Sequence, residues 1–239
     1  MAQLLRADLL PEAWIAPAKV RQLRALLRHR ISLVRLGTQL RNRIHAVAAD
    51  HGYDRSASYW TGPGRGWLAE LDLPATSREI ITDCLAVIDA LAVLIDRIDG
   101  ELHQHAKADP RVKVLRTLPG VGEFTALVML AEIGDISRFP SARKLAAWAG
   151  LTPTVRGSDL KVRHGHISKQ GSAWVRWILC EAAQKAKRSP QFAASYAAIA
   201  RRRGKKIATI AIARKLLTRA WHLLNEMQAA GASTPPRRP

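Results

Sequence analysis

The chain has 239 residues, of which 48% are hydrophobic, and its formal charge is +19, from 38 Lys/Arg against 19 Asp/Glu. This length allows one substantial core or one domain with an extended element, and the apolar content excludes a purely basic tail. The two cysteines, Cys84 and Cys180, are too few for a disulfide framework or a zinc site, which predicts buried thiols in a reducing cytoplasm.

The positive charge is unevenly distributed along the chain. Residues 1–110 contain 14 Lys/Arg against 13 Asp/Glu, whereas residues 111–239 contain 24 against 6. This excess predicts a nucleic-acid-binding second half that follows a nearly neutral structural arm. No run approaches the ~20 apolar residues of a membrane span, and Asp8 and Pro11 interrupt any signal-peptide core. We therefore expect a cytoplasmic, nucleoid-associated protein with no membrane partner.

The first half is predicted to form two long helices after a linker over residues 1–16. One helix runs from Pro17 to about Asp50, and the other begins with a capping box formed by Thr76 and Glu79. Between them, residues 51–74 are predicted to form a loop around a short amphipathic turn. Apolar residues recur every seven positions in both helices, at Leu26, Leu33, Leu40 and Val47, at Ile81, Ile88, Ile95 and Leu102, and at Cys84, Leu91 and Ile98. Residues 17–109 are therefore expected to form an antiparallel coiled-coil hairpin; alternatively, the seams pair between two chains in a homo-oligomer.

Asp109–Pro110 is predicted to end the arm, and a helix-hairpin-helix pattern follows over Val112–Gly134. Its turn reads LPGVG, and its backbone at Gly120, Val121 and Gly122 is expected to face a DNA phosphate at the start of the second helix. The alternative is a helical turn that serves only for packing.

The remaining elements are also predicted to be helical. Helices are expected at about 141–148, 172–188, from Ser189–Pro190 onward, and at about 207–228, with a short extended pair near Lys161–Val162 and His166–Ile167. Trp174 and Trp177 share a helical face and are expected in the core, and residues 229–239 are expected to be disordered. The predicted fold class is all-α: the coiled-coil hairpin, then a compact basic helical domain over residues 110–228.

The stretch from Gly150 to Leu179 carries the candidate chemistry. It places Ser158 among lysines, arginines and glycines, and Asp159 is its only carboxylate. Glycine allows close backbone approach and cations neutralise an anion, so this composition predicts contact with phosphate. The predicted DNA-binding side chains are Lys161, Arg163, Lys169 and Arg176, with Arg202 and Lys205 of the RRRGKK run as a second contact. An ordinary basic loop with an incidental serine, and a solvated charge run, are the alternatives; His164 and His166 lack the partners of a metal site.

These residues resemble a known family. The sequence GLTP, a serine eight residues after Gly150, and G-x-I-S-K-x-G at 165–171 before a Trp/Arg-rich helix are similar to the transposase domain of the insertion-sequence-110/116/902 family. LPGVG and the continuation AEIGDISRF at 131–139 match the same domain, and LLRADLLPEAW resembles the linker into its coiled coil. These proteins are DNA transposases related to Piv-type invertases.

The resemblance implies a two-part mechanism. A RuvC-like amino-terminal domain holds divalent metal such as Mg²⁺ with acidic residues, and a serine of the carboxy-terminal domain attacks the DNA phosphodiester. By similarity that serine is Ser158, and a structured guide RNA is an implied second partner. The resemblance implies no cofactor for this chain itself, because the acidic residues of 1–110 lack the alternating strands that a RuvC-like domain needs.

Two departures from the family pattern bear on activity. Family members commonly have Ser-Ser-Gly where this chain has Gly157-Ser158-Asp159, and the acid is expected to weaken phosphate approach. The chain also matches a family member that begins after its metal-binding domain. The first hypothesis is a transposase part that cleaves only with a RuvC-like domain supplied elsewhere. The alternative is a non-catalytic helix-hairpin-helix DNA-binding scaffold or an element remnant.

Overall fold

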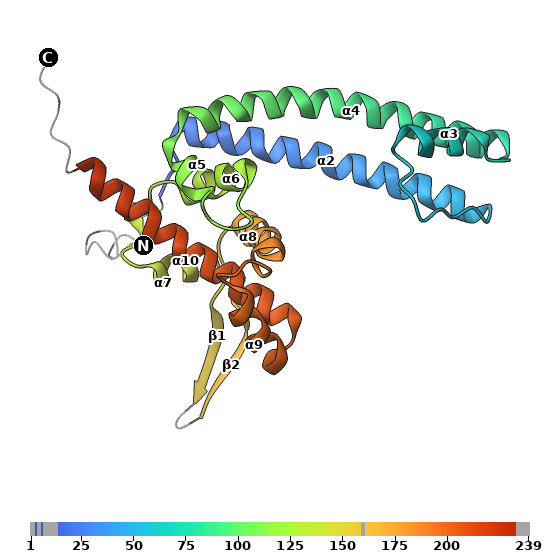
Figure 1. The fold of residues 1–239 in the computed structure, drawn as a ribbon. Coiled ribbons are helices and arrows are strands. Elements are labelled where there is room, and N and C mark those ends of the chain that lie inside the picture. The colour runs from blue at the N-terminus through green and yellow to red at the C-terminus, as the bar shows by residue number, and fades with distance from the viewer. Residues whose placement is uncertain (1–2, 4–5, 7–13, 159–160, 233–239) are drawn as a thin grey trace, which may run out of the picture. The chain divides into compact units, whose positions relative to one another are not determined.

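The computed structural model describes residues 3, 6, 14–158 and 161–232. The described part is mainly helical, as predicted, and it also contains one two-stranded antiparallel sheet. Two compact units are present: unit 1 comprises residues 1–24 and 105–239, and unit 2 comprises residues 25–104. The elements in chain order (Figure 1) are α2 (Ala18–Asp50), α3 (Gly62–Glu70), α4 (Ala75–Ala108), α5 (Pro110–Leu115), α6 (Glu123–Ile133), η1 (Ile136–Arg138), α7 (Ala142–Trp148), β1 (Pro153–Ser158), β2 (Lys161–Ile167), α8 (Ala173–Ala186), α9 (Ala193–Arg203) and α10 (Lys205–Ala232).

Unit 2 is built on the middle and end of α2 and most of α4. Arg30 near the start of α2 donates to both carboxylate oxygens of Asp99 near the end of α4. Further along α2, a Cβ added at Gly37 would lie 3.9 Å from the Leu91 side chain. Ile44 and Ala48 at the end of α2 join a cluster with residues from the start of α4. Successive residues of α2 therefore meet earlier residues of α4, so the two helices run in opposite directions.

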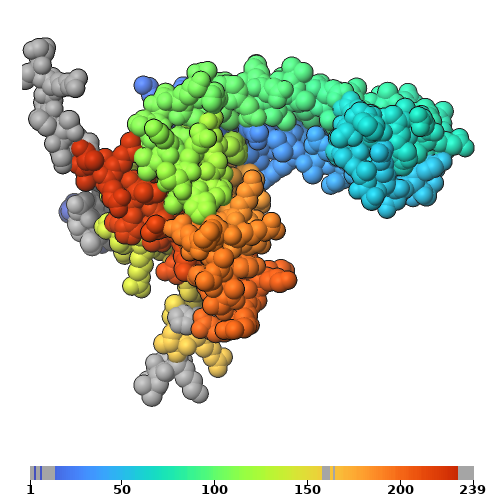
Figure 2. Space-filling model, viewed as in Figure 1, coloured from blue at the N-terminus to red at the C-terminus, as the bar shows by residue number. Residues whose placement is uncertain are grey.

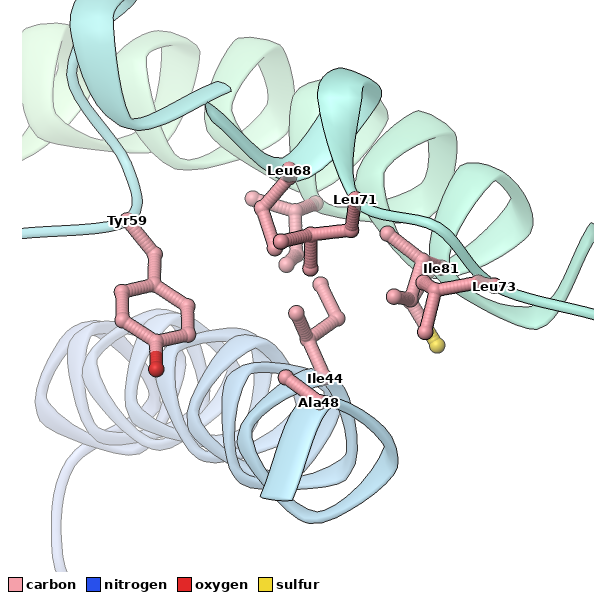
Figure 3. Close-up of a cluster of buried hydrophobic side chains, with 9 residues drawn as sticks. Ile44, Ala48, Tyr59, Leu68, Leu71, Leu73 and Ile81 are labelled. Atoms are coloured by element: carbon pink, nitrogen blue, oxygen red, sulfur yellow. The ribbon is translucent and has the colours of Figure 1, made fainter. Parts of the chain in front are cut away.

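Residues of the segment between α2 and α4 pack with residues of both helices in a hydrophobic cluster (Figure 3). Tyr59 is only 1% exposed, and Leu68 of α3 lies in the same cluster. The predicted amphipathic turn is thus a nine-residue helix, capped by the hydroxyl of Thr61, which accepts from the amide of Gly64. Gly64 packs directly on the backbone of Ser58 and Tyr59, leaving no room for a Cβ.

The boundary residues of α4 confirm one prediction and correct another. The helix begins at Ala75, and the amide of Arg78 donates to the carbonyl of Pro74. Thr76 therefore lies inside the helix, and the predicted capping box with Glu79 is wrong. At the other end α4 stops at Ala108, and Asp109 caps α5 through the amide of Arg111. The predicted break at Asp109–Pro110 is confirmed.

The core of unit 1 is formed around α6 and α10. Eight of the eleven residues of α6 are buried, as expected for a helix that is apolar on all sides. α10 packs against α5, α7, α8, α9 and η1. Its Ile212, Leu216 and Leu217 are fully buried. Trp221 adds a hydrogen bond from Nε1 to the carbonyl of Phe139.

Two arginines cap the carboxy-terminal end of α6. Arg24 donates to the carbonyl oxygens of Ala131 and Glu132, at 2.7 and 3.0 Å, and Arg138 donates to that of Ile133 at 3.1 Å. The centre of the Trp14 ring lies 5.5 Å from the guanidinium carbon of Arg24 and 3.9 Å from that of Arg138. Cations at this end satisfy free carbonyls and complement the helix dipole. The first residues of α2 thereby belong to unit 1.

Other predicted boundaries also differ from the observed ones. α10 begins at Lys205 and continues to Ala232, so residues 229–232 are helical and their predicted disorder is wrong. Residues 233–239, and most of the predicted linker 1–16, lie outside the described residues. Trp174 and Trp177, expected in the core, are half-buried and meet edge to face at 6.2 Å.

Candidate nucleic-acid interface

The stretch predicted as a basic loop is a β-hairpin. β1 and β2 pair antiparallel, with the Cα partners Val155–His164, Arg156–Arg163, Gly157–Val162 and Ser158–Lys161. The extended segments predicted to pair, Lys161–Val162 and His166–Ile167, both lie in β2, so that pairing is wrong, and the actual partner strand β1 was missed. Figure 2 shows the hairpin projecting from the rest of unit 1. Ser158 ends β1, and the following residues 159–160 lie outside the described ones.

The described faces of the hairpin differ in chemistry. Arg156 and Arg163 are exposed and directly opposite each other on the two strands. Val155 and Val162 are 59% and 62% exposed and occupy the alternate positions. Successive strand residues point to opposite faces, so the two arginines share one face of the hairpin and the two valines share the other. Arg163 was predicted as a DNA contact, whereas Arg156 was missed.

A bulge near the base of the hairpin explains one of its glycines. The register shifts between Pro153 and Val155, and the Thr154 hydroxyl donates to the carbonyl of His166 at 3.1 Å. A Cβ at Gly165 would lie 2.5 Å from that hydroxyl oxygen. Gly165 therefore leaves room for the side chain that stabilises the bulge.

The root of the hairpin, residues 149–152 and 168–171, is held by close backbone contacts. Gly150, Lys169 and Gly171 all have positive φ, and Lys169 is the one non-glycine residue with this conformation in the described part. Arg176 Nη1 donates to the carbonyls of Ala149, Gln170 and Gly171, at 3.2, 2.7 and 3.2 Å. This nitrogen of Arg176, predicted to bind DNA, therefore holds the root together. The exposed Lys169 side chain remains at the surface.

A buried carboxylate joins the root to the core. Glu132 of α6 is 6% exposed and accepts a hydrogen bond of 3.0 Å from the Ser172 hydroxyl. Ser172 in turn caps α8 by accepting from the amide of Val175. The start of α8, directly after the hairpin, is thus linked to the central helix of the core. Sequence reasoning assigned no role to Glu132, although it is the one carboxylate within the apolar run of α6.

The predicted helix-hairpin-helix segment forms α5, a turn and α6. Gly120 has φ 78° and packs on the carbonyl of Ala182 in α8, with no room for a Cβ. Val121 is buried, and its amide donates to the carbonyl of Leu118. Gly122 is exposed, has open space around its Cβ position, and precedes α6 without a side-chain cap. Of the three predicted contacts, Gly122 is therefore the one at the surface.

The second predicted cationic contact lies at the junction of α9 and α10. Gly204 ends α9 with φ 87°, and Arg202 and Lys205 are exposed on either side of it. The neighbouring Arg201, Arg203 and Lys206 are exposed as well. The junction therefore presents a dense group of cations to solvent.

Two carboxylates of unit 1, Asp109 and Asp135, form hydrogen bonds with residues two positions further along the chain. Burial raises the pKa of Asp109, but hydrogen bonds and the charge of Arg111 outweigh it, so the pKa is lowered overall. Hydrogen bonds from Ser137 lower the pKa of Asp135. Both carboxyl groups therefore stay ionised, and neither belongs to the hairpin.

The described residues offer no site for divalent metal. Within ranges 14–158 and 161–232, no three His, Cys, Asp or Glu side chains gather as ligands. The acidic cluster that would hold Mg²⁺ is therefore not formed by them. Burial raises the pKa of the Cys180 thiol, and Cys84 is buried. Among the described helices, none has an apolar stretch long enough to cross a bilayer.

Comparison with known proteins places this unit among transposases. Residues 112–197 match the model of the transposase IS116/IS110/IS902 family. This match begins in α5, includes the whole hairpin and ends in α9.

Several curated relatives are similar over most of the chain. A probable family 20 transposase of Pseudomonas aeruginosa is 25% identical over 88% of this chain and 65% of its own length. A putative transposase of Sinorhizobium fredii, y4qE, is 30% identical over 77% of this chain and 45% of the relative. The pilin gene-inverting protein of Moraxella bovis is 31% identical over 55% of this chain and 44% of its own. The chain thus spans between about half and two thirds of the length of the first two. The resemblance predicted from the sequence is confirmed: residues 112–197 match the model of the transposase IS116/IS110/IS902 family, and relatives similar over most of the chain are named as transposases.

Proposed function

We propose that this chain is the DNA-binding part of a transposase or site-specific recombinase, and that Ser158 attacks a DNA phosphodiester. The observation that carries the proposal is the β-hairpin. It exposes cationic side chains, its first strand ends at Ser158, and it lies within the segment that matches the family. Relatives named as transposases and as a gene-inverting protein support the reaction class.

The reaction would proceed by in-line transfer at phosphorus. The Ser158 oxygen forms a bond to phosphorus while the bond to one deoxyribose oxygen breaks, leaving a phosphoserine link and a DNA hydroxyl. The serine proton passes to a base, and the leaving oxygen takes up a proton. Lys161 and Lys169 would neutralise charge on the oxygens of the attacked phosphate, and Arg163 would bind the DNA backbone beside it. In keeping with the family resemblance, we assign the Mg²⁺ chemistry to a RuvC-like domain and not to the described residues of this chain.

Two further segments have supporting roles in this proposal. Gly122 lies at the start of α6, where a phosphate would meet the positive end of the helix dipole. Arg116, 3.8 Å from Glu123, and the exposed Thr117 flank it. We assign α5–α6 as a helix-hairpin-helix that binds DNA without regard to base sequence, and the paired helices of unit 2 as a coiled coil that brings two copies together. The exposed cations at the α9–α10 junction would bind DNA or a structured guide RNA.

The test of the nucleophile is formation of a covalent protein–DNA adduct. The chain is mixed with Mg²⁺, end-labelled element DNA and a separately produced RuvC-like domain, and adducts are resolved on denaturing gels. Adducts are expected from the unaltered chain and from Ser168→Ala, and none from Ser158→Ala. Ser168 is a matched control because its buried hydroxyl has no hydrogen-bond partner among the described residues, so its removal costs little. Adducts that persist with Ser158→Ala would disprove the assignment.

The second candidate, a non-catalytic DNA-binding scaffold, is favoured by the exposed cations of the α9–α10 junction, which could bind DNA without Ser158. It predicts salt-sensitive DNA binding without adducts under any of these conditions. In both candidates the logarithm of affinity should fall steeply with the logarithm of salt concentration, by about 0.9 for each phosphate that is bound. An affinity that does not change with salt concentration would contradict DNA binding in both candidates.

A further inference from the structure

One pair on the hairpin is unfavourable in the protein by itself. Arg156 and Arg163 are direct cross-strand partners, which puts their Cβ atoms about 4.5–5.5 Å apart. Like charges at such positions destabilise a sheet, and an isolated two-stranded hairpin is only marginally stable. Neither arginine takes part in the ion pairs that the described residues form. The pair is therefore costly for the hairpin unless an anion lies between the two guanidinium groups.

We propose that Arg156 and Arg163 jointly bind one phosphate of a DNA strand, adjacent to the phosphate attacked by Ser158. The inference rests on the proposed function, which it deepens by adding Arg156 and by assigning both arginines to a single phosphate. Guanidinium groups bind phosphate oxygens in a two-pronged geometry that a lysine cannot reproduce. Two of them on facing strands surround an anion from both sides.

The register sets the distance between this phosphate and the reacting one. Ser158 and Lys161 form the next pair of the same parity, two residues toward the turn from Arg156 and Arg163. Two residues of a strand span about 7 Å, which is comparable to the step between neighbouring phosphates of one DNA strand. The arginine pair thus binds the backbone beside the scissile phosphate and positions it, and it does not itself react.

The other face of the hairpin argues against a merely charged protrusion. A segment that only increased solubility would carry charge on both faces. Val155 and Val162 instead expose 59% and 62% of their surface on the alternate positions. The cations are therefore restricted to the positions that share the parity of Ser158.

The test is a salt titration of DNA binding with a double-mutant cycle. The full chain, Arg156→Gln, Arg163→Gln and the double variant are measured by fluorescence anisotropy with a labelled duplex. Arg143→Gln is the charge-matched control, because Arg143 lies at the surface on α7 of the same unit. Each single variant should bind about tenfold more weakly or worse at low salt. Because one phosphate is shared, the double variant should lose about 0.9 from the salt slope, with losses in affinity that are not additive.

Several outcomes would overturn the inference. Variants that behave as Arg143→Gln would show that the pair does not contact DNA. A slope reduced by about 1.8 in the double variant, with additive losses, would show two separate phosphates. If the unaltered chain binds with no salt dependence, the proposed function itself fails. If it binds with a normal slope and only the hairpin variants are without effect, this inference alone fails.

A charge reversal gives a second measurement that does not depend on loss of function. Arg163→Glu converts the repulsive pair into a cross-strand ion pair with Arg156. Amide hydrogens of β1 and β2 should then exchange more slowly than in the unaltered chain, while DNA affinity falls more than tenfold. Unchanged affinity together with slower exchange would show that the pair matters only to the hairpin, which would refute phosphate binding.

Discussion

Unit 2 and unit 1 use charged residues in opposite ways. Unit 2 has 9 Lys/Arg against 10 Asp/Glu, whereas unit 1 has 29 against 9. In unit 2, Arg30 pairs with Asp99 and Arg65 pairs with Asp89, each between segments distant in sequence. In unit 1, described pairs such as Asp109–Arg111 are local, and the hairpin and the α9–α10 junction present exposed cations.

This difference separates two uses of electrostatics. In unit 2, Arg30–Asp99 joins α2 to α4 and Arg65–Asp89 joins α3 to α4, and the nearly equal numbers of cations and carboxylates leave almost no net charge. The cations of unit 1 exceed the available carboxylates, so their charge can be balanced only by counterions or by an anionic ligand. A polyanion that displaces counterions gains affinity from their release. The charged residues of unit 2 therefore mainly stabilise its fold, whereas the excess cations of unit 1 are available to bind an anionic ligand.

The largest expected effect concerns the turn that both packs and is proposed to bind DNA. Gly120→Ala introduces a Cβ at positive φ against the carbonyl of Ala182. The strain and overlap should lower the free energy of unfolding by roughly 2–5 kcal/mol, as measured by urea denaturation. Gly122→Ala is the matched change in open space, where loss of a glycine cap costs about 1 kcal/mol at most. If Gly122 meets a phosphate, Gly122→Ala should instead weaken DNA binding. Equal destabilisation by both changes would contradict the packing role of Gly120.

Removing equal charge from the two units should affect DNA binding unequally. The variant Arg202→Gln/Lys205→Gln/Lys206→Gln is expected to reduce the salt slope by about 0.9 for each phosphate that it no longer binds, and the affinity by on the order of tenfold or more. Arg35→Gln/Arg43→Gln/Arg97→Gln removes three exposed cations from unit 2 and should leave the slope unchanged. Similar reductions in both triple variants would erase the distinction between the units.

Acid should weaken the start of α5. Arg111 holds the pKa of Asp109 below its ordinary value. The ionised carboxylate therefore stabilises the fold fully at pH values above the ordinary pKa of an aspartate. This stability is lost as the pH falls through the lowered pKa. From pH 7 to pH 3, Asp109→Asn should therefore lose less unfolding free energy than the unaltered chain, by on the order of 1 kcal/mol. Asparagine still caps a helix, so a parallel loss in both proteins would assign the effect to other groups.

The smallest expected effect concerns the ion pairs of unit 2. Asp99→Asn breaks a partly exposed pair with Arg30 and should cost about 0.5–1 kcal/mol, measured by thermal unfolding at low salt. Asp89→Asn, at the more exposed pair with Arg65, should have a smaller effect that disappears in 0.5 M salt, about three times the physiological ionic strength. A larger effect at Asp89 than at Asp99 would show that exposure does not rank these pairs.

The helices were predictable because their signals are local. Pro17, as a first-turn residue, located the start of α2 to within a residue, and Asp109–Pro110 located the break after α4. The start of α4 was missed because Pro74 and Ala75 initiate the helix earlier than the Thr76–Glu79 pattern. Several residues can accept hydrogen bonds from the free amides of the first helical turn, and sequence spacing alone does not show which of them does so.

The hairpin and its root were less predictable. Both strands contain a Val-Arg step, Val155–Arg156 and Val162–Arg163, which is the alternation typical of a strand. Glycines and charges on both sides obscured that signal, so β1 was missed, and the two segments expected to pair with each other both lie in β2. Arg176 was assigned to DNA because its charge was visible, whereas the carbonyls that it binds come together only in the folded root. Such a role depends on positive φ at Gly150 and Gly171, which follows from tertiary packing.

The construction of the root has a consequence for how the hairpin can vary. Its two strands leave a firmly held base, and the antiparallel register repeats every two residues. Adding or deleting residues in cross-strand pairs would change its reach and preserve which side chains share a face. A single-residue change in one strand would exchange the arginine and valine faces beyond that point. Length variation among homologous hairpins should therefore occur in even steps, except where a bulge like the one between Pro153 and Val155 absorbs an extra residue.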